Sequence, residues 1–428
     1  MTSQPTATVG RHPAAGRLTA PQGAALTVGA VLGTGVIGLP ALSAQIAGPA
    51  SLLAWLALIG LSVPLAATFA ALGARYPDAG GVATYVRTAF GPSVAAAVGW
   101  CFYFAVPAGA PAAAMFAGGY VAAAFGGGTT TTVATACALL LLVTATNAMG
   151  LRVSGRLQLA LTALLAALLL AAAVTALPYA RLDNLVPFAP NGWLAVGTAA
   201  AALVWAFAGW EAVTHLAADF RRPARDLPRA LAVAVVTVGV LYLGVATSSL
   251  LVLGPAAGAT QAPLAELLAI GVGGEARVLT AVAALLLTMG AMNAYLAGAA
   301  KLGAALGRDG ALPGWLARGS QAGQVPRRSM MVVSGLCLLA IAGVAAAGLG
   351  PRPSVMLTTG AFTLVYVLGT AAAVRLLPAG TWSRRAAAVA LVAGVVLLVM
   401  SGPYVLWTLV VALAAIWYER RNRTRRTA

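Results

Sequence analysis

The feature that most constrains this chain is a series of twelve long apolar runs, separated by short stretches that carry charges, glycine or proline. A helix needs about 20 apolar residues to cross a bilayer. Backbone groups in the hydrocarbon must pair within that helix, because lipid offers no partner. The runs therefore predict membrane helices at residues 22–46, 51–74, 92–125, 133–149, 157–179, 194–217, 231–254, 278–305, 330–350, 354–377, 386–401 and 403–418.

The composition is also that of a membrane protein. Of the 428 residues, 61% are hydrophobic and 8% are charged, whereas about a quarter of a soluble domain is charged. A soluble enzyme, a secreted disulfide scaffold and a disordered chain are excluded. Cys101, Cys137 and Cys337 lie far apart inside apolar runs, so we expect buried thiols and no disulfide framework.

The basic residues predict the orientation of the helices. If both termini are cytoplasmic, 23 of the 26 basic residues fall in inner segments, and only Arg181, Arg277 and Arg352 fall outside. This is the positive-inside pattern, and it requires a hairpin at Gly402-Pro403 within 386–418. The net charge of +17 therefore sets topology and contacts membrane lipid, and we expect no nucleic-acid partner.

The first run contains three glycines in six residues: Gly33, Thr34, Gly35, Val36, Ile37 and Gly38, with Pro40 just beyond. The pattern matches a dinucleotide fingerprint, but the required strand and the following acidic residue are missing. Two interpretations remain. The glycines let helices pack closely, or the helix unwinds inside the membrane and lines a polar cavity. We favour unwinding, because interrupted helices mark transporter sites.

Glu211 is the only acidic residue deep in a predicted span, in the sixth run. A carboxylate at the bilayer centre costs about 2.5–3.5 kcal/mol on insertion scales, so it usually has a function. A structural, protonated or paired glutamate is the alternative. His215 lies one helical turn further on. It either shares a proton with Glu211 or is a satisfied histidine near the inner interface.

The first run, with its three glycines, and the sixth run, with Glu211, each begin a block of five predicted helices. The blocks are 22–179 and 194–377. Interrupted helices at matching positions of two halves predict an inverted repeat with the substrate site between them. We therefore expect an all-α integral membrane protein of twelve transmembrane helices, in which helices 1 and 6 of a five-plus-five inverted repeat are broken. A two-helix hairpin at 386–418 lies outside the repeat. Cytoplasmic tails at 1–21 and 419–428 complete the chain.

Four stretches carry a family resemblance: residues 33–40 (GTGVIGLP), 75–91 (RYPDAGGVATYVRTAFG), 207–231 (FAGWEAVTHLAADFRRPARDLPRAL) and 293–313 (NAYLAGAAKLGAALGRDGALP). With these stretches in this order, the chain resembles the amino acid–polyamine–organocation (APC) transporter superfamily along nearly its whole length. Residues 207–231 look most like the bacterial exporters of methionine and branched-chain amino acids.

The resemblance implies a substrate site at the two breaks. Backbone N–H groups at the first break would bind the substrate carboxylate, and carbonyls of the second would accept from its ammonium. Aromatic side chains there would line the side-chain pocket. The residues so implied are Gly33, Thr34, Gly35, Val36, Ile37 and Gly38 for the carboxylate; Ala206, Phe207, Ala208 and Gly209 for the ammonium; and Phe207 and Trp210 for the pocket.

The sequence thus predicts a secondary active transporter, and no enzyme, in the cell inner membrane. We expect it to export neutral, hydrophobic amino acids (methionine, leucine, isoleucine and valine), without cofactor or metal. Protons are the candidate coupling ion, with Glu211 and His215 as candidate carriers. The lysine that some proton-coupled relatives carry in span 5 is missing, and Thr288 stands alone where sodium-coupled relatives have adjacent hydroxyls. An importer or exchanger of other amino acids or amines, or a channel, stays open as the alternative.

Overall fold

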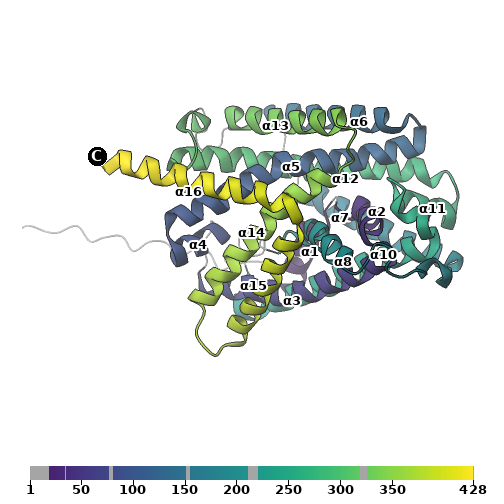
Figure 1. Ribbon diagram of the computed structural model, residues 1–428, viewed down its shortest axis with the longest axis horizontal. Helices are drawn as coiled ribbons and strands as arrows, with labels where there is room; N and C mark the ends of the chain where they lie inside the picture. Colours follow the sequence, from purple (N-terminus) through teal and green to yellow (C-terminus); the bar gives the residue numbers. More distant parts are fainter. Residues whose placement is uncertain are drawn as a thin grey trace, which may run out of the picture.

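The computed structural model describes residues 19–33, 35–76, 81–150, 155–210, 220–318 and 325–427. In these ranges the chain forms helices joined by short loops (Figure 1). The α-helices are α1 (Ala20–Val31), α2 (Gly35–Ala47), α3 (Ser51–Arg75), α4 (Val82–Phe90), α5 (Pro92–Phe125), α6 (Gly128–Ala148), α7 (Gly155–Ala176), α8 (Leu194–Leu203), α10 (Pro223–Leu253), α11 (Pro263–Val272), α12 (Ala276–Asp309), α13 (Arg327–Ala346), α14 (Arg352–Leu376), α15 (Trp382–Met400) and α16 (Val405–Thr427).

Short 3₁₀ segments join or extend several of these helices. They are η1 (Gly48–Ala50), η2 (Leu177–Tyr179), η3 (Leu182–Leu185), η4 (Val204–Phe207), η6 (Gly254–Gly258), η7 (Gly314–Ala317) and η8 (Gly402–Tyr404). Segment η8 separates α15 from α16 at Gly402-Pro403, where the charge distribution predicted a break. Segment η4 continues α8 into the second predicted interruption.

Among the described residues, ten helical segments are long and apolar enough to cross a membrane. The chain is therefore a multi-pass, all-helical membrane protein, as predicted. There are ten such segments and not twelve, because two of the predicted runs do not form single long helices. Residues 22–46 divide into α1 and α2, of which α2 joins α3 in one long apolar segment. Of residues 194–217, the described part is 194–210, and it contains the short apolar helix Leu194–Phe207.

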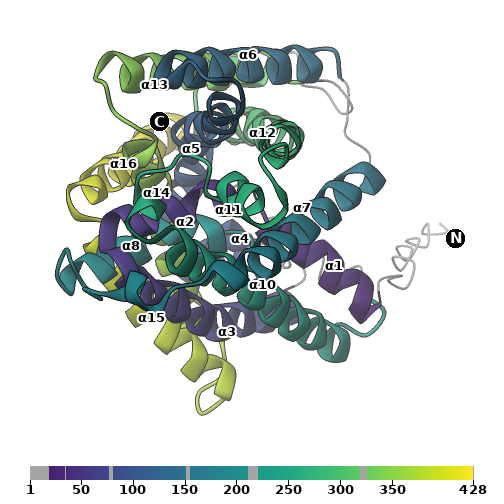
Figure 2. The same ribbon diagram turned by 90° about the vertical axis from the view of Figure 1, so that its right-hand side faces the viewer.

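The longest helices, α5 and α12, lie side by side (Figure 1). Each has 34 residues, which is about 51 Å at 1.5 Å per residue. Since the hydrocarbon core is about 30 Å thick, both extend beyond it or tilt. Helices α6 and α13 pack on each other and form an outer layer over α5 and α12, as Figure 2 shows.

Small residues set the spacing of these helices. A Cβ atom on Gly118 of α5 would lie 2.3 Å from the carbonyl oxygen of Thr132 on α6, so the two backbones nearly touch. A Cβ on Gly99 would lie 2.7 Å from a methyl carbon of Leu306 on α12. Close packing of this kind drives helix association in lipid, where the solvent is as apolar as the side chains.

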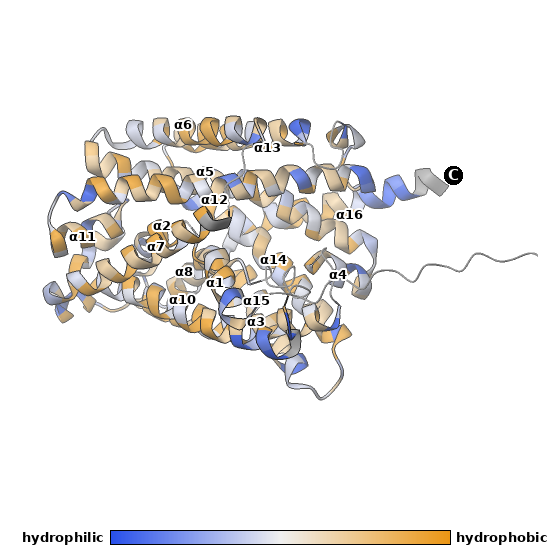
Figure 3. Ribbon diagram, turned by 180° about the vertical axis from the view of Figure 1, so that it is seen from behind, coloured by the Kyte–Doolittle hydropathy of each residue, from blue (hydrophilic) through white to orange (hydrophobic). Residues whose placement is uncertain are grey.

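The outer surface is apolar as well. Hydrophobic residues cover the long helices in Figure 3, whereas hydrophilic residues gather toward helix ends. Large side chains such as Val392, Val399 and Leu413 are more than half exposed, as expected for residues that face lipid. The three cysteines are free thiols. Cys101 and Cys337 are buried, and Cys137 is partly exposed.

Candidate functional site

The first predicted interruption is present in the fold. Helix α1 ends at Val31 and α2 begins at Gly35. The N–H of Leu32 donates to the carbonyl oxygen of Val28 at 2.7 Å, which closes the last turn of α1. The N–H of Gly33 turns back to the carbonyl oxygen of Val31, also at 2.7 Å. The chain thus leaves one helical axis before α2 starts, and Thr34 lies outside the described residues.

The second interruption follows η4. Ala208 is extended, with φ −70° and ψ 137°, and Gly209 has φ +127°. A side chain rarely adopts that φ value, so glycine is required there. Glu211 and His215 lie outside the described residues, which end at Trp210 on this side and resume at Phe220.

The two interruptions contact each other. A Cβ atom on Gly209 would lie 2.8 Å from the carbonyl oxygen of Ala30 and 3.3 Å from the Cα of Val31. A Cβ on Gly35 would lie 3.5 Å from the Cα of Ala206. Two segments about 175 residues apart in sequence therefore meet backbone to backbone.

The hydroxyl of a buried tyrosine of α10 contacts the backbone of both interruptions. The Tyr242 hydroxyl lies 2.9 Å from the carbonyl oxygen of Val31 and 3.0 Å from that of Ala206. Its ring packs against Trp55 at 5.5 Å and Phe207 at 5.3 Å between ring centroids. From α14, the Tyr366 hydroxyl accepts a hydrogen bond from the N–H of Gly209 at 3.2 Å. Backbone groups released by the helix ends are thus partnered by side chains, as apolar surroundings require.

A cavity of about 810 Å³ lies against both interruptions. Leu32 and Gly33 line it from the first, and Ala208 and Gly209 from the second. The remaining walls come from α1, α4, α5, α7, α12 and α14. Their side chains are apolar apart from the hydroxyls of Thr162 and Tyr295, and no described lining residue is charged. Among the described residues, a molecule in this cavity would meet backbone groups at the interruptions and uncharged side chains elsewhere.

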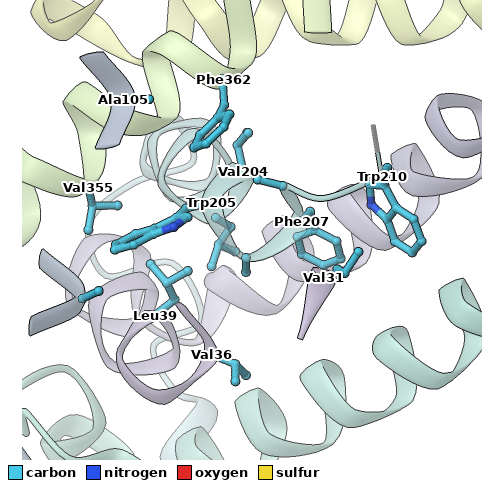
Figure 4. Close-up of a cluster of buried hydrophobic side chains, with 14 of the residues drawn as sticks. Val31, Val36, Leu39, Ala105, Val204, Trp205, Phe207, Trp210, Val355 and Phe362 are labelled. Carbon is cyan, nitrogen blue, oxygen red and sulfur yellow. The ribbon is translucent and has the colours of Figure 1, made fainter. Parts of the chain in front are cut away.

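Three of the other predicted site residues, Val36, Phe207 and Trp210, belong to a cluster of buried hydrophobic side chains (Figure 4). Val36 and Ile37 are each 1% exposed. A Cβ on Gly38 would meet the ring of Phe116 at 2.3 Å, so this glycine serves packing. Trp210 is fully buried. Neither it nor Phe207 borders the 810 Å³ cavity; Phe207 instead borders a small cavity of about 20 Å³ between α3, α14 and α15.

Trp205 was not among the predicted site residues. Its ring lies 6.0 Å from that of Phe116, and it borders a further cavity of about 20 Å³ between α5, α12 and α14. This small cavity shares four lining residues with the large one: Val106, Ala291, Tyr295 and Phe362. Sequence reasoning also missed Tyr242 and Tyr366. One signal was available: tyrosine normally marks the membrane interface, whereas these two lie in the middle of long apolar helices.

An interrupted helix that meets the end of a second helix beside a cavity, in a helical membrane protein, is typical of transporters. The sequence profile of the amino acid permease family matches residues 18–427. The chain therefore belongs to the amino acid permease family, which is a family of membrane transporters. This confirms the predicted membership of the APC superfamily.

Relatives from two bacteria support this assignment. The uncharacterized amino acid permease YecA of Bacillus subtilis (strain 168) is 32% identical over 402 residues, which cover 93% of this chain and 94% of YecA. The L-methionine/branched-chain amino acid exporter YjeH of Escherichia coli (strain K12) is 38% identical over 226 residues, 52% of this chain and 53% of YjeH. The branched-chain amino acid permease BcaP of Bacillus subtilis (strain 168) is 25% identical over 313 residues, which cover 68% and 67% of the two chains.

Proposed function

We propose that this protein exports neutral, hydrophobic amino acids (methionine, leucine, isoleucine and valine) by alternating access. In this proposal the chain crosses the cell inner membrane twelve times, with inverted repeats at 22–179 and 194–377 and both termini in the cytoplasm. The observation that carries it is the pair of interruptions that meet at Gly209 beside a cavity whose described lining residues are uncharged. Backbone dipoles there suit a zwitterionic amino acid, and the uncharged wall suits an apolar side chain.

The carboxylate would bind at the start of α2, whose first three residues are buried beside the cavity and would have to open toward it. The first N–H groups of a helix, here those of Gly35, Val36 and Ile37, have no acceptor within the helix. The helix dipole adds partial positive charge at the same end. The N–H of Gly33 already donates to Val31, so it would have to leave that bond before it could join them.

The ammonium would bind between the carbonyls that Tyr242 approaches. A tyrosine hydroxyl has one proton to donate, yet the carbonyl oxygens of Val31 and Ala206 both lie within 3.0 Å of it. At least one carbonyl therefore keeps an open acceptor site. The Val31 oxygen also accepts from the N–H of Gly33, but a carbonyl oxygen has two lone pairs. A substrate ammonium could therefore donate to whichever of the two carbonyls the tyrosine leaves open.

The apolar walls support selection of a neutral side chain. An unpaired charge in a dry cavity costs several kcal/mol, and no described residue that lines either the large cavity or the one at Trp205 is charged. The smaller cavity, next to Trp205 and Thr358, is a natural place for the end of a branched or thioether side chain. The substrates in the names of YjeH and BcaP agree with this selectivity.

The cavity is proposed to face the cytoplasm in this structure. Its walls include Val82 and Ala83 of α4 and Leu302 near the end of α12. The neighbouring basic residues Arg87 and Lys301 belong to the segments that the positive-inside rule places in the cytoplasm. Proton coupling through Glu211, with His215 as the alternative carrier, rests on the sequence alone.

The experiment that tests the function is a panel of radiolabelled amino acids with the purified protein in proteoliposomes, with and without a pH gradient. We expect saturable, stereospecific flux of methionine, leucine, isoleucine and valine, each competing with the others. Arginine, lysine and glutamate should not compete. Strong competition by arginine would refute the assigned selectivity, and flux that does not saturate would indicate a channel.

A further inference from the structure

The last helix changes character near its end. Helix α16 is apolar from Val405 to Tyr418, and arginine then occupies five of the eight positions from 419 to 426. The apolar part spans about 21 Å and the charged part about 12 Å at 1.5 Å per residue. A headgroup layer is about 5–7 Å thick, so the charged part reaches through it into water. In Figure 3 this end of α16 is hydrophilic and projects beyond the neighbouring helices.

One face of this end is attached to α5. The Ser93 hydroxyl in the first turn of α5 donates to a carboxylate oxygen of Glu419 at 2.5 Å. The Tyr418 ring lies 5.9 Å from the ring of Trp100. Glu419 thus places negative charge at the positive end of the α5 dipole, which stabilises the contact.

The same face reaches the end of α12. The side-chain amide of Asn422 donates to the carbonyl oxygen of Gly310, just after α12, at 3.1 Å. Trp100 of α5 donates from Nε1 to the carbonyl oxygen of the next residue, Ala311, at 2.7 Å. Residues 418–422 therefore join the ends of the two long helices that also line the 810 Å³ cavity.

The opposite face carries exposed aromatic and basic groups. Trp417 is 59% exposed, and the Arg421 guanidinium lies over its ring at 5.2 Å. Arg420, Arg421 and Arg423 are all exposed. Trp417 sits where the apolar part of α16 ends, which is the level of the membrane interface that tryptophan prefers.

We propose that residues 417, 420, 421 and 423 form a binding surface for the headgroups of anionic phospholipids. Guanidinium groups bind phosphate oxygens through paired N–H donors, and the stacked indole places Arg421 at the depth of the phosphates. Each arginine near an anionic leaflet strengthens binding to it by about a factor of five in the binding constant. We assign a lipid headgroup as the ligand of this surface because Trp417 lies at the membrane interface. A headgroup phosphate is the first anion that Arg421 meets there.

Lipid bound there would hold residues 418–422 on α5 and α12. The attached and lipid-facing groups alternate along the same two turns of helix. A headgroup that orders Arg420 and Arg421 therefore also orders Glu419 and Asn422. The ends of both cavity helices would then be fastened to each other while lipid is bound.

The test measures thermal unfolding of the full-length protein in detergent as phosphatidylglycerol, phosphatidylcholine or inorganic phosphate is added. We expect phosphatidylglycerol to raise the Tm and the other two to have little effect. In the variant R420Q/R421Q the amount of phosphatidylglycerol needed for half of the stabilisation should rise about 25-fold. The variant R327Q/R328Q is the matched control, because it removes two adjacent exposed arginines from the start of α13, and it should respond as the wild type does.

Three results would overturn the proposal. Equal stabilisation of R420Q/R421Q and the wild type would show that lipid binds elsewhere. An equal loss in R327Q/R328Q would show a diffuse effect of positive charge. Stabilisation by inorganic phosphate would show a site for a soluble anion. The Tm of each protein without lipid is measured first, and stabilisation by lipid is taken relative to that value, which separates lipid binding from folding. No step depends on which amino acid is transported.

Discussion

The replacement Tyr242→Phe isolates the hydroxyl that ties the two interruptions. Phenylalanine keeps the ring that packs on Trp55 and Phe207, so the fold should form. The one hydroxyl proton that lies between the carbonyl oxygens of Val31 and Ala206 is lost. The Val31 oxygen keeps its hydrogen bond from the N–H of Gly33, so the cost falls mainly on the Ala206 oxygen. Hydrogen bonds between membrane helices contribute about 0.6 kcal/mol on average and up to about 1.7 kcal/mol. An orphaned buried acceptor costs about 1–3 kcal/mol.

We therefore expect Tyr242→Phe to lower the free energy of unfolding by about 1 kcal/mol. Substrate binding should weaken about fivefold, since about 1.4 kcal/mol corresponds to a factor of ten and the ammonium acceptors are no longer held in place. The assays are thermal unfolding in detergent, binding of radiolabelled substrate, and flux in proteoliposomes.

The matched control is Tyr103→Phe, which removes the hydroxyl of another buried tyrosine, on α5, next to Gly303. It should leave substrate affinity unchanged. The reasoning would be refuted if Tyr242→Phe bound and transported substrate like the wild type. It would also be refuted if both tyrosine variants lost affinity equally.

Three further replacements probe the interruptions and the proton. Gly209→Ala should destabilise the fold by about 1–3 kcal/mol and abolish flux, because its Cβ would lie 2.8 Å from the Ala30 carbonyl oxygen at φ +127°. The control Gly60→Ala, whose Cβ has open space, should be neutral. Normal flux with Gly209→Ala would contradict the close contact. Gly35→Leu should remove substrate binding by driving a side chain into the η4 backbone, while protein still accumulates in the membrane; intact methionine binding would count against this site. Glu211→Gln should keep part of the counterflow exchange but lose uphill flux driven by a pH gradient, and full pH-driven accumulation would eliminate Glu211 as the proton carrier.

Local properties of the sequence determined the membrane helices and the first interruption. The length of each apolar run decides whether a helix can cross the bilayer, so the predicted ranges 51–74 and 92–125 match α3 (Ser51–Arg75) and α5 (Pro92–Phe125) closely. Glycine lowers helix stability wherever it occurs, so three glycines beginning at Gly33 marked the gap between α1 and α2. Both effects act within a few residues and need no knowledge of the fold.

Tertiary structure decided which residues around the interruptions border the cavity. Gly33, Ala208 and Gly209 do, whereas Phe207 turns into the core between Trp55 and Tyr242. Beyond a helix end, the direction of a side chain depends on backbone torsions that no periodicity describes. Those torsions are held by partners remote in sequence, such as the Tyr242 hydroxyl from α10 and the Tyr366 hydroxyl from α14. Only the packing of α10 and α14 around the interruptions brings these hydroxyls to the released backbone groups.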